Sequence, residues 1–290
     1  MFFLPTKETP ILCQGITSNA GAVHTELALA YGSNIVAGIS ADKNIKQFLG
    51  VPVFKTVADA VRAKSPKVSV IFSTPVHALA DVQEAVKAGI KMVVCITERV
   101  PMHDALTMKT LAKENDVCLL GPSSMGIGVM GQTVIGSVPL HLFQKGKIGL
   151  VGRSGSLMWE VAGQLAAFGL GVSHVISLGA DHLIGTSFVP PVKALLADEK
   201  TQGILVVGQV HGELEYELAR FYKRQKNKKP IWVYIPGRSL EKSEKRPLLG
   251  MQTVKFSDVI DRKKEVLLDA GVRWIDSPDM FGKALKKDKR

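Results

Sequence analysis

The sequence predicts an α/β protein with two doubly wound, mainly parallel sheets that follow one another along the chain. Short apolar runs of strand length alternate with amphipathic stretches of helix length over most of the 290 residues. This alternation is typical of strand–helix–strand units around a parallel sheet. It stops once, over residues 126–146, which show no helical period.

The first alternation begins near residue 10 and ends near residue 120. Gly32 and Gly89 follow two of its helices, where a glycine easily takes the left-handed conformation that ends a helix. The expected strands are Pro10–Gln14, Asn34–Gly38, Val68–Phe72, Met92–Cys95 and Cys118–Leu120. The expected helices lie near Gly21–Tyr31, Thr56–Ala63, Ala78–Ala88 and Pro101–Asn115.

The second alternation begins at Gly146, so we expect one domain over residues 1–126, a linker over 127–146 and a second domain over 147–290. Its expected strands are Lys147–Gly152, Gly171–Ser177, Gly203–Gly208, Pro230–Tyr234 and Arg273–Ile275. Its expected helices lie near Leu157–Phe168, Val189–Ala197, Glu213–Gln225, Asp261–Ala270 and Asp279–Lys286.

The composition is that of an ordinary globular protein, with 46% hydrophobic and 22% charged residues. Cys13, Cys95 and Cys118 lie in apolar runs without CxxC spacing, which indicates buried free thiols in a reducing compartment. The seven histidines are dispersed, and no set has metal-ligand spacing. No apolar run has the length of a membrane span, and the start does not resemble a signal peptide. We expect a cytoplasmic protein, with the mitochondrial matrix or a related organelle as the alternative.

The formal net charge of +11 is concentrated near the end of the chain. Residues 220–290 contain 20 Lys and Arg against 9 Asp and Glu, which accounts for the whole excess. A basic surface attracts polyanions, but a solvated helix face with a charged tail gives the same pattern. Because no aromatic interleaving or nucleic-acid motif accompanies the charge, we expect neither a nucleic-acid nor a membrane partner.

Two loops of the first domain have the residue types of an anion site. The loop Gln14–Gly21 is rich in small residues, which allow an anion to approach the N–H groups at a helix start. Its spacing is not GxGxxG, and an ordinary capped turn has the same residues. After the next strand, Lys43 stands where an NAD site would have an acidic residue, and a lysine there suits a phosphorylated ribose.

Further candidate loops follow other expected strands, where ligands of doubly wound sheets bind. Ser73-Thr74-Pro75 and Ile96-Thr97-Glu98 lie at strand ends in the first domain. In the second domain, Gly152–Ser156 combines glycine and hydroxyl residues at a helix start, a pattern typical of phosphate sites. Gly179-Ala180-Asp181 follows the next strand and offers further donors or a capping carboxylate.

Several of these motifs occur together, in this order and at similar spacing, in one known family. They are Cys13-Gln14-Gly15-Ile16-Thr17, Leu49-Gly50-Val51-Pro52-Val53-Phe54, Ile96-Thr97-Glu98, Gly121-Pro122 and Arg153-Ser154-Gly155-Ser156-Leu157. With these motifs, and with Asp269-Ala270-Gly271-Val272 near its end, the sequence resembles the α subunit of succinate–CoA ligase over essentially its whole length.

The resemblance implies a CoA-binding Rossmann-type domain followed by a flavodoxin-like ligase domain. It implies coenzyme A or an acyl-CoA as ligand, and an ATP-grasp β subunit in a heterodimer or heterotetramer. In that family, acyl-CoA, phosphate and NDP exchange with acid, CoA and NTP through a phosphorylated histidine. Carried over by position, the phosphate loop is Ser154, Gly155 and Ser156, and the CoA contacts are Thr17, Ser18, Asn19, Ala20, Lys43, Ile96, Thr97 and Glu98.

The sequence departs from the family at the positions that carry phosphoryl transfer. The family's phosphohistidine loop corresponds to residues 237–251, which contain no histidine, and none occurs anywhere after His211. The glutamate that partners the phosphohistidine is replaced by Gln209, which removes a negative charge that an imidazolium favours. The family's Asn-Cys pair is replaced by Ser123-Ser124, and a tyrosine near the substrate is replaced by Trp159.

Three hypotheses follow. In the first, the chain binds CoA but has lost or changed its phosphoryl chemistry, because the nucleophile of the covalent relay is missing. In the second, it is an active enzyme: an acid–CoA ligase with a substitute residue, for which His211 is the candidate, or a related acyl transferase without a phosphoenzyme. In the third, it is an NAD(P)-binding Rossmann protein, which the absent GxGxxG spacing disfavours.

Overall fold

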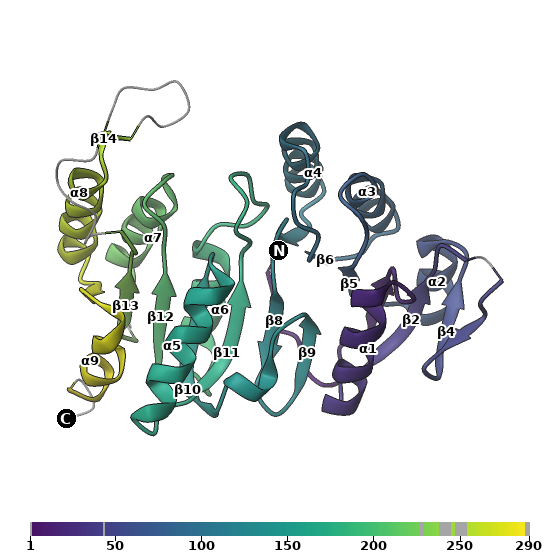
Figure 1. The fold of residues 1–290 in the computed structure, drawn as a ribbon, viewed down its shortest axis with the longest axis horizontal. Helices are drawn as coiled ribbons and strands as arrows, with labels where there is room; N and C mark the ends of the chain where they lie inside the picture. Colours follow the sequence, from purple (N-terminus) through teal and green to yellow (C-terminus); the bar gives the residue numbers. More distant parts are fainter. Residues whose placement is uncertain (1, 43, 227–228, 238–244, 247–253, 288–290) are drawn as a thin grey trace.

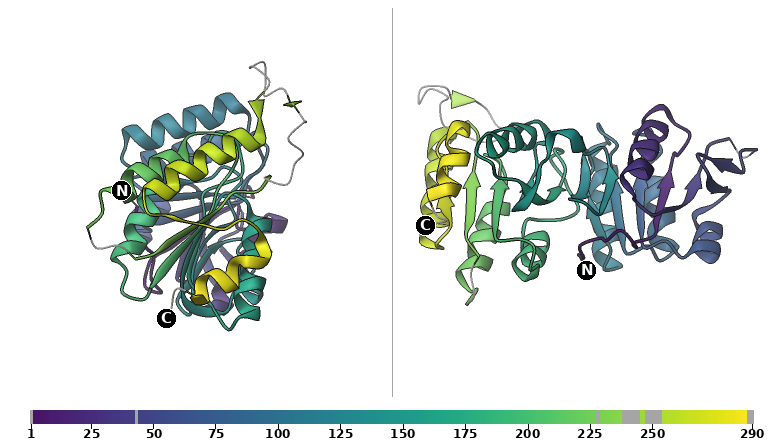
Figure 2. Two further views of the ribbon diagram at one scale, coloured as in Figure 1. Left: turned by 90° about the vertical axis from the view of Figure 1, so that its left-hand side faces the viewer. Right: turned by 90° about the horizontal axis from the view of Figure 1, so that it is seen from below.

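The computed structural model describes residues 2–42, 44–226, 229–237, 245–246 and 254–287. Two seven-stranded sheets lie side by side, with helices on both faces of each (Figure 1). Viewed from the end, the strands run through the middle of the molecule between two layers of helices (Figure 2). The predicted class, two doubly wound α/β sheets in series, is confirmed.

The first sheet has the order β3-β4-β2-β1-β5-β6-β7, with parallel pairing except between β3 and β4. The expected strands and helices are present within a few residues of their predicted bounds, and the sequence analysis missed only the short edge hairpin β3–β4. The strands are β1 (Ile11–Gln14), β2 (Ile35–Ile39), β3 (Gln47–Phe48), β4 (Val51–Phe54), β5 (Val68–Ile71), β6 (Met92–Cys95) and β7 (Cys118–Leu120). The helices are α1 (Asn19–Tyr31), α2 (Val57–Lys64), α3 (Ala78–Lys87) and α4 (Met102–Glu114).

The second sheet has the order β16-β13-β12-β10-β11-β8-β9 and is parallel from β16 to β11. Its parallel strands are β10 (Lys145–Gly152), β11 (Val172–Ser177), β12 (Gly203–Val207), β13 (Ile231–Tyr234) and β16 (Arg273–Trp274). Its helices are α5 (Gly155–Ala167), α6 (Val189–Ala197), α7 (Leu214–Lys223), α8 (Phe256–Asp269) and α9 (Phe281–Lys287). Short additional elements are η1 (Leu140–Leu142), η2 (Pro278–Met280), β14 (Lys245–Arg246) and β15 (Val254–Lys255).

The segment that the sequence analysis predicted as a linker contributes two strands to the second sheet. β8 (Gly126–Val129) and β9 (Thr133–Gly136) form a hairpin, and β8 pairs in antiparallel fashion with β11. Both strands are buried along their whole length. A strand buried on both faces has neither a helical period nor a polar–apolar alternation, so periodicity did not reveal this hairpin.

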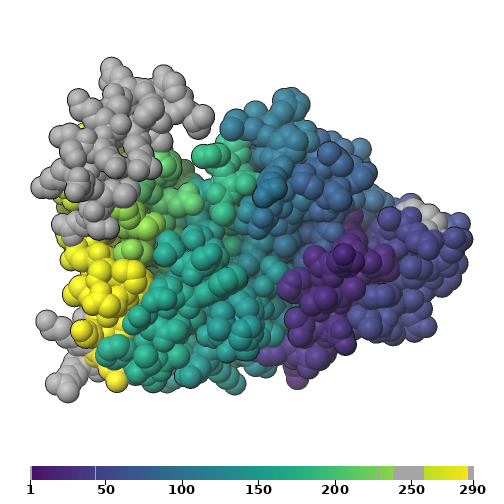
Figure 3. Space-filling view, viewed as in Figure 1, coloured from purple at the N-terminus to yellow at the C-terminus, as the bar shows by residue number. Residues whose placement is uncertain are grey.

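Main-chain hydrogen bonds join the two sheets through the loops after β7 and β11. Gly121 N donates to the Leu178 carbonyl oxygen over 3.0 Å, and Ala180 N donates to that of Ser123 over 3.0 Å. Gly185 N donates in turn to the carbonyl oxygen of Gly121 over 2.9 Å. In the space-filling view the two halves meet along a broad boundary (Figure 3). We call this set of loop contacts the interdomain seam.

The three cysteines are buried and free of disulfides, as the sequence analysis expected. Burial raises the pKa of the Cys13 and Cys95 thiols to about 12, and that of Cys118 to about 11. All three are therefore neutral at physiological pH and serve as small apolar core residues. None of the helices in the described residues is long and apolar enough to span a bilayer.

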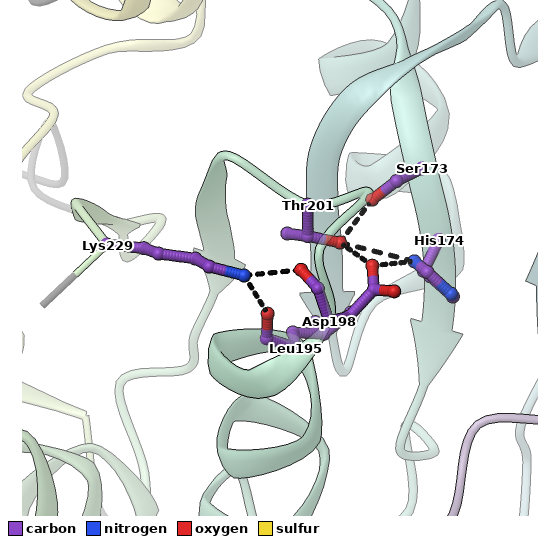
Figure 4. A network of polar contacts seen from close by, with 6 residues as sticks. All are labelled: Ser173, His174, Leu195, Asp198, Thr201 and Lys229. Atoms are coloured by element: carbon purple, nitrogen blue, oxygen red, sulfur yellow. Dashed lines mark hydrogen bonds and ion pairs between the residues drawn. The ribbon is translucent and has the colours of Figure 1, made fainter. Parts of the chain in front are cut away.

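A buried polar network lies at the amino-terminal edge of the second sheet (Figure 4). The Thr201 hydroxyl donates to Asp198 Oδ2 over 2.6 Å and lies 2.7 Å from Ser173 Oγ. The same Asp198 oxygen is 3.6 Å from Nδ1 of His174, whose side chain is only 3% exposed. Lys229 Nζ donates to the carbonyl oxygens of Leu195 and Asp198, at the carboxyl end of α6. We call Ser173, His174, Asp198 and Thr201 the buried network.

A test of the interdomain seam is the replacement of Gly179 by alanine. Gly179 has φ +109°, and a Cβ there would lie 2.2 Å from the Pro122 carbonyl oxygen across the seam. Gly89 has φ +87° but open space around it, so Gly89→Ala is a matched control. We expect Gly89→Ala to cost about 1–2 kcal/mol of unfolding free energy from backbone strain alone. Gly179→Ala should cost roughly 1–3 kcal/mol more because of the added overlap. Equal losses in urea unfolding would contradict the close approach.

A second prediction concerns the pH dependence of stability. Burial lowers the pKa of His174, the nearby cations Lys200 and Lys229 act in the same direction, and the Asp198 carboxylate opposes them. Below the ordinary histidine pKa of about 6.5, the unfolded chain therefore binds more protons at this position than the folded protein. Stability should fall as the pH drops through that range, by at most about 1.4 kcal/mol per pH unit from this group. Urea unfolding between pH 7.5 and 5.5 should show a shallower slope in His174→Gln, and an unchanged slope in the exposed control His141→Gln. A wild-type slope in His174→Gln would contradict the prediction.

Candidate functional site

The loop between β1 and α1 is held close to the end of β5. Ser18 caps the helix: its Oγ accepts a hydrogen bond from Gly21 N over 3.0 Å and donates to the Phe72 carbonyl oxygen over 3.1 Å. Gly15 has φ +77°, and a Cβ there would lie 2.7 Å from that same carbonyl oxygen. Asn19 and Ala20 are exposed in the first turn of α1. Their position presents the helix N-terminus, a typical anion-binding element, to solvent.

Polar groups at the ends of β2, β5 and β6 lie along the same edge of the first sheet. Thr17 Oγ1 is 2.7 Å from Ser40 Oγ, which also accepts a hydrogen bond from Asp42 N over 3.1 Å. Thr97 Oγ1 donates to the Ser73 carbonyl oxygen over 2.9 Å. Because β2, β1, β5 and β6 are neighbours in the sheet, the topology gathers these loops. The residues so gathered are Thr17, Ser18, Asn19, Ala20, Ile96, Thr97 and Glu98, whereas Lys43 lies outside the described residues.

The second domain places Ser154, Gly155 and Ser156 at the start of α5, directly after β10. Ser154 caps the helix, since its Oγ accepts a hydrogen bond from Leu157 N over 3.4 Å. A Cβ on Gly155 would meet only the sulfur of Met125, at 3.7 Å, so the space next to this residue is not filled by close contacts. Trp159, one turn further along α5, is 43% exposed.

Arg153 connects this loop to the interdomain seam. Its side chain is only 5% exposed, its Nε donates to the Gly179 carbonyl oxygen over 3.0 Å, and its Nη2 donates to that of Asp181. Burial lowers the pKa of Arg153, and the carboxylates of Glu215 and Asp181 oppose this shift. The guanidinium therefore fixes the loop after β11 through its hydrogen bonds to Gly179 and Asp181.

The two serines that replace the family's Asn-Cys pair have structural partners at the seam. Ser124 Oγ donates to the Ser177 carbonyl oxygen over 2.7 Å and accepts a hydrogen bond from Gly126 N over 2.9 Å. Ser123 N donates to the carbonyl oxygen of Thr97 over 2.9 Å. This pair therefore links the end of β6 to the end of β11.

An ion pair that the sequence analysis missed supports the loop at residues 209–212. Lys263 on α8 and Glu215 on α7 are 0% and 1% exposed, and their Nζ and Oε2 atoms lie 2.6 Å apart. Glu215 Oε1 accepts a hydrogen bond from Gln209 N over 2.8 Å, and Lys263 Nζ donates to the Gln209 carbonyl oxygen over 2.9 Å. Lys263 also donates to the His211 carbonyl oxygen over 3.4 Å. The ion pair thus fixes the backbone of this loop through hydrogen bonds.

Further ionisable groups surround the same region. Burial raises the pKa of Asp181, and Glu98 adds to this shift while His182 and Arg153 oppose it. Asp181 Oδ2 is buried and has no hydrogen-bond partner among the described residues. Burial lowers the pKa of His211, as do the positive charges of His182, Lys263 and Arg153. Both shifts favour the uncharged form of the group concerned.

A cavity of about 670 Å³ opens beside these groups, between α4 of the first domain and the loops after β11 and β12. Arg153 and His182 line it together with Lys109 and Lys113 of α4 and Glu213 and Glu217 near α7. Its size falls within the range of small-molecule sites. No group of three or more His, Cys, Asp or Glu in the described part of the chain is arranged to hold a metal ion.

Comparison with known proteins identifies both domains. A model described as a CoA binding domain matches residues 6–99, so coenzyme A is the cofactor of the first domain. A model described as a succinyl-CoA ligase like flavodoxin domain matches residues 145–281.

Two curated relatives and one solved structure are similar to the chain over most of its length. A succinate–CoA ligase [ADP-forming] subunit alpha 2 of Archaeoglobus fulgidus is 40% identical over 82% of this chain and 82% of its own. A malate–CoA ligase subunit alpha of Methylorubrum extorquens is 33% identical over 97% of this chain and 96% of its own. The ATP citrate lyase of Methanosaeta concilii, solved with (3S)-citryl-CoA, has the same fold, with a TM-score of 0.82 and 22% identity. That match covers 98% of this chain, which spans 50% of the lyase chain. The chain belongs to the family of succinate–CoA ligase α subunits.

Proposed function

We propose that the chain is the CoA-binding α subunit of an acid–CoA ligase in which the phosphoryl relay through histidine is lost or altered. The observation that carries the proposal is the absence of histidine after His211 in a chain that keeps the family's loops. A covalent relay requires a nucleophile at a fixed place, and the family's nucleophile lies in the part of the chain that corresponds to residues 237–251. Of that stretch, Gly237 and residues 245–246 are described by the structure.

The proposed CoA contacts are the residues gathered at the carboxyl edge of the first sheet. The exposed first turn of α1 suits the negative charge of the CoA phosphates, because its N–H groups and dipole favour anions. Lys43 adds a cation for the phosphorylated ribose. Ile96, Thr97 and Glu98 lie at the seam, where the chain of the cofactor would pass toward the second domain. The family match favours CoA over a nicotinamide dinucleotide.

The proposed phosphate loop is Ser154, Gly155 and Ser156, at the start of a 13-residue helix. Trp159 on the exposed side of α5 is the proposed contact for the acid substrate. We propose a dicarboxylate as this substrate, because the relatives are named for succinate and malate. Because the relatives are named as α subunits, we propose an ATP-grasp β subunit as partner, in a heterodimer or heterotetramer.

A second candidate, an active ligase that uses His211, rests on the position of that residue. His211 lies in the same loop as Gln209, the residue that replaces the family's partner glutamate. The carbonyl oxygen of His211 accepts a hydrogen bond from the buried Lys263. The lowered pKa favours the neutral imidazole, which is the form that accepts a phosphoryl group. However, the backbone there differs from that of the family's nucleophile, and misplacement of a nucleophile is costly for catalysis.

The CoA proposal predicts that Lys43→Gln weakens CoA binding at least about tenfold, since a hydrogen bond to a charged group contributes roughly 1.5–3 kcal/mol. Thr17→Val, which removes the contact with Ser40, should also weaken it. Isothermal titration with CoA measures both effects, and Lys64→Gln, an exposed lysine on α2, is the charge-matched control. Unchanged CoA affinity in Lys43→Gln, or equal weakening in Lys64→Gln, would count against the assignment of Lys43.

The relay proposal predicts no acid-labile phosphoprotein and no succinyl-CoA when the chain is combined with an ATP-grasp β subunit, labelled NTP, CoA and succinate. The positive control is the same β subunit with a histidine-containing α subunit of this family. Labelling that disappears in His211→Gln, but persists in His141→Gln, would instead establish the second candidate. Robust turnover by the wild-type chain would refute the loss of phosphoryl chemistry.

A further inference from the structure

A cleft lined by lysines opens at the amino-terminal edge of the second sheet, the edge opposite to the loops discussed above. Its larger lobe has a volume of about 420 Å³, and an adjoining lobe has a volume of about 210 Å³. The two lobes share Lys145, Gly146 and Lys147 at the start of β10 as a common wall. The larger lobe alone is within the size range of small-molecule sites.

The larger lobe is lined by three lysines and by no carboxylate. Lys145 and Lys147 come from β10, and Lys200 comes from the loop before β12. Within the described residues, none of their ammonium groups has a carboxylate oxygen within 4.0 Å. The rest of the lining consists of two polar residues, two apolar residues and two glycines: Gln132, Ser173, Val129, Met130, Gly131 and Gly146. Three positively charged residues around one cleft repel one another, and a bound anion relieves this repulsion.

The backbone shapes the floor of the cleft. Lys145 and Ile148 both pair with Val172, so β10 bulges at Gly146 and Lys147. A Cβ on Gly146 would lie 2.3 Å from the backbone of Gly171, so the two chains touch there without side chains between them. A Cβ on Gly131 would lie 3.2 Å from Lys145 Nζ, which places this ammonium over the turn between β8 and β9.

The buried network (Figure 4) adjoins the lysine-lined cleft at Ser173. Ser173 belongs to both: it lines the cleft and lies 2.7 Å from the Thr201 hydroxyl. Lys200 precedes Thr201 in the chain, and the hydrogen bond from Thr201 to Asp198 fixes the backbone from which Lys200 extends. The Asp198 carboxylate accepts a hydrogen bond from Thr201 and lies close to His174, so its contacts are with the buried network. Hydrogen bonds of the buried network therefore fix the backbone next to Lys200.

We propose that this cleft binds a small, multiply charged anion of the phosphate class, such as the diphosphate group of a nucleotide. Ammonium groups bind phosphate oxygens as point charges, and three of them match a ligand with several negative charges. The site is separate from the proposed CoA contacts, because it lies at the opposite edge of the strands and on the other domain. It is therefore independent of whether the phosphoryl relay is lost.

Inorganic pyrophosphate is a suitable probe, titrated calorimetrically into the full chain in the presence of saturating CoA, which keeps the proposed CoA site occupied. The triple variant Lys145→Gln, Lys147→Gln, Lys200→Gln should bind it at least about tenfold more weakly, since one charge-assisted hydrogen bond alone accounts for such a factor. The control triple variant Lys64→Gln, Lys87→Gln, Lys283→Gln has the same change in net charge. Its three exposed lysines lie on different helices and should leave the affinity unchanged.

Amine acetylation followed by mass spectrometry locates the bound probe directly. Pyrophosphate should reduce the labelling of Lys145, Lys147 and Lys200 severalfold, and should leave that of Lys64, Lys87 and Lys283 unchanged. No measurable pyrophosphate binding in the presence of CoA would overturn the proposal. So would equal weakening in the two triple variants, or protection spread evenly over all six lysines.

Discussion

The interdomain seam is the constraint on which the rest of the site depends. It is made of main-chain hydrogen bonds between the loops after β7 and β11, so these bonds need no particular polar side chain in the loops. Gly121 and Gly179 are both required to be small there, since a Cβ on either would lie within 2.3 Å of a carbonyl oxygen. The seam brings the loops after β6, β7 and β11 into direct contact. Ligand loops that are distant in sequence, such as those at Thr97 and Arg153, are close in space for this reason.

The buried Lys263–Glu215 pair has a similar role for the loop at residues 209–212. Both charges are desolvated, so their attraction contributes only if the remaining polar atoms are satisfied. Here they are: Glu215 accepts from the Gln209 amide, and Lys263 donates to two carbonyl oxygens of the same loop. The loop is held by its backbone and not by the side chain at position 209. A glutamine at position 209 is therefore compatible with this conformation of the loop.

Much of this fold could be predicted from the sequence, because parallel strands buried on both faces are short apolar runs between amphipathic helices. The same physics explains what was missed. The hairpin β8–β9 is glycine-rich and buried on both faces, so no period separates it from a linker. Lys263 is part of the basic excess over residues 220–290, although it lies on the buried face of α8 between Ile260 and Leu267. Loop positions were predictable from strand ends, whereas the partners of Arg153 and Ser124 depend on contacts between domains, which single-sequence patterns do not encode.

Net charge along the chain does not show where like charges gather in the fold. The excess of basic residues lies after position 219, yet one of them, Lys263, is neutralised inside the protein by Glu215. The three lysines of the amino-edge cleft come from a part of the chain whose charges balance. What distinguishes them is that they line one cleft, beside a β-bulge, two touching glycine backbones and a buried hydroxyl network. Local electrostatic potential is set by how many like charges face a shared low-dielectric wall, which only the fold determines.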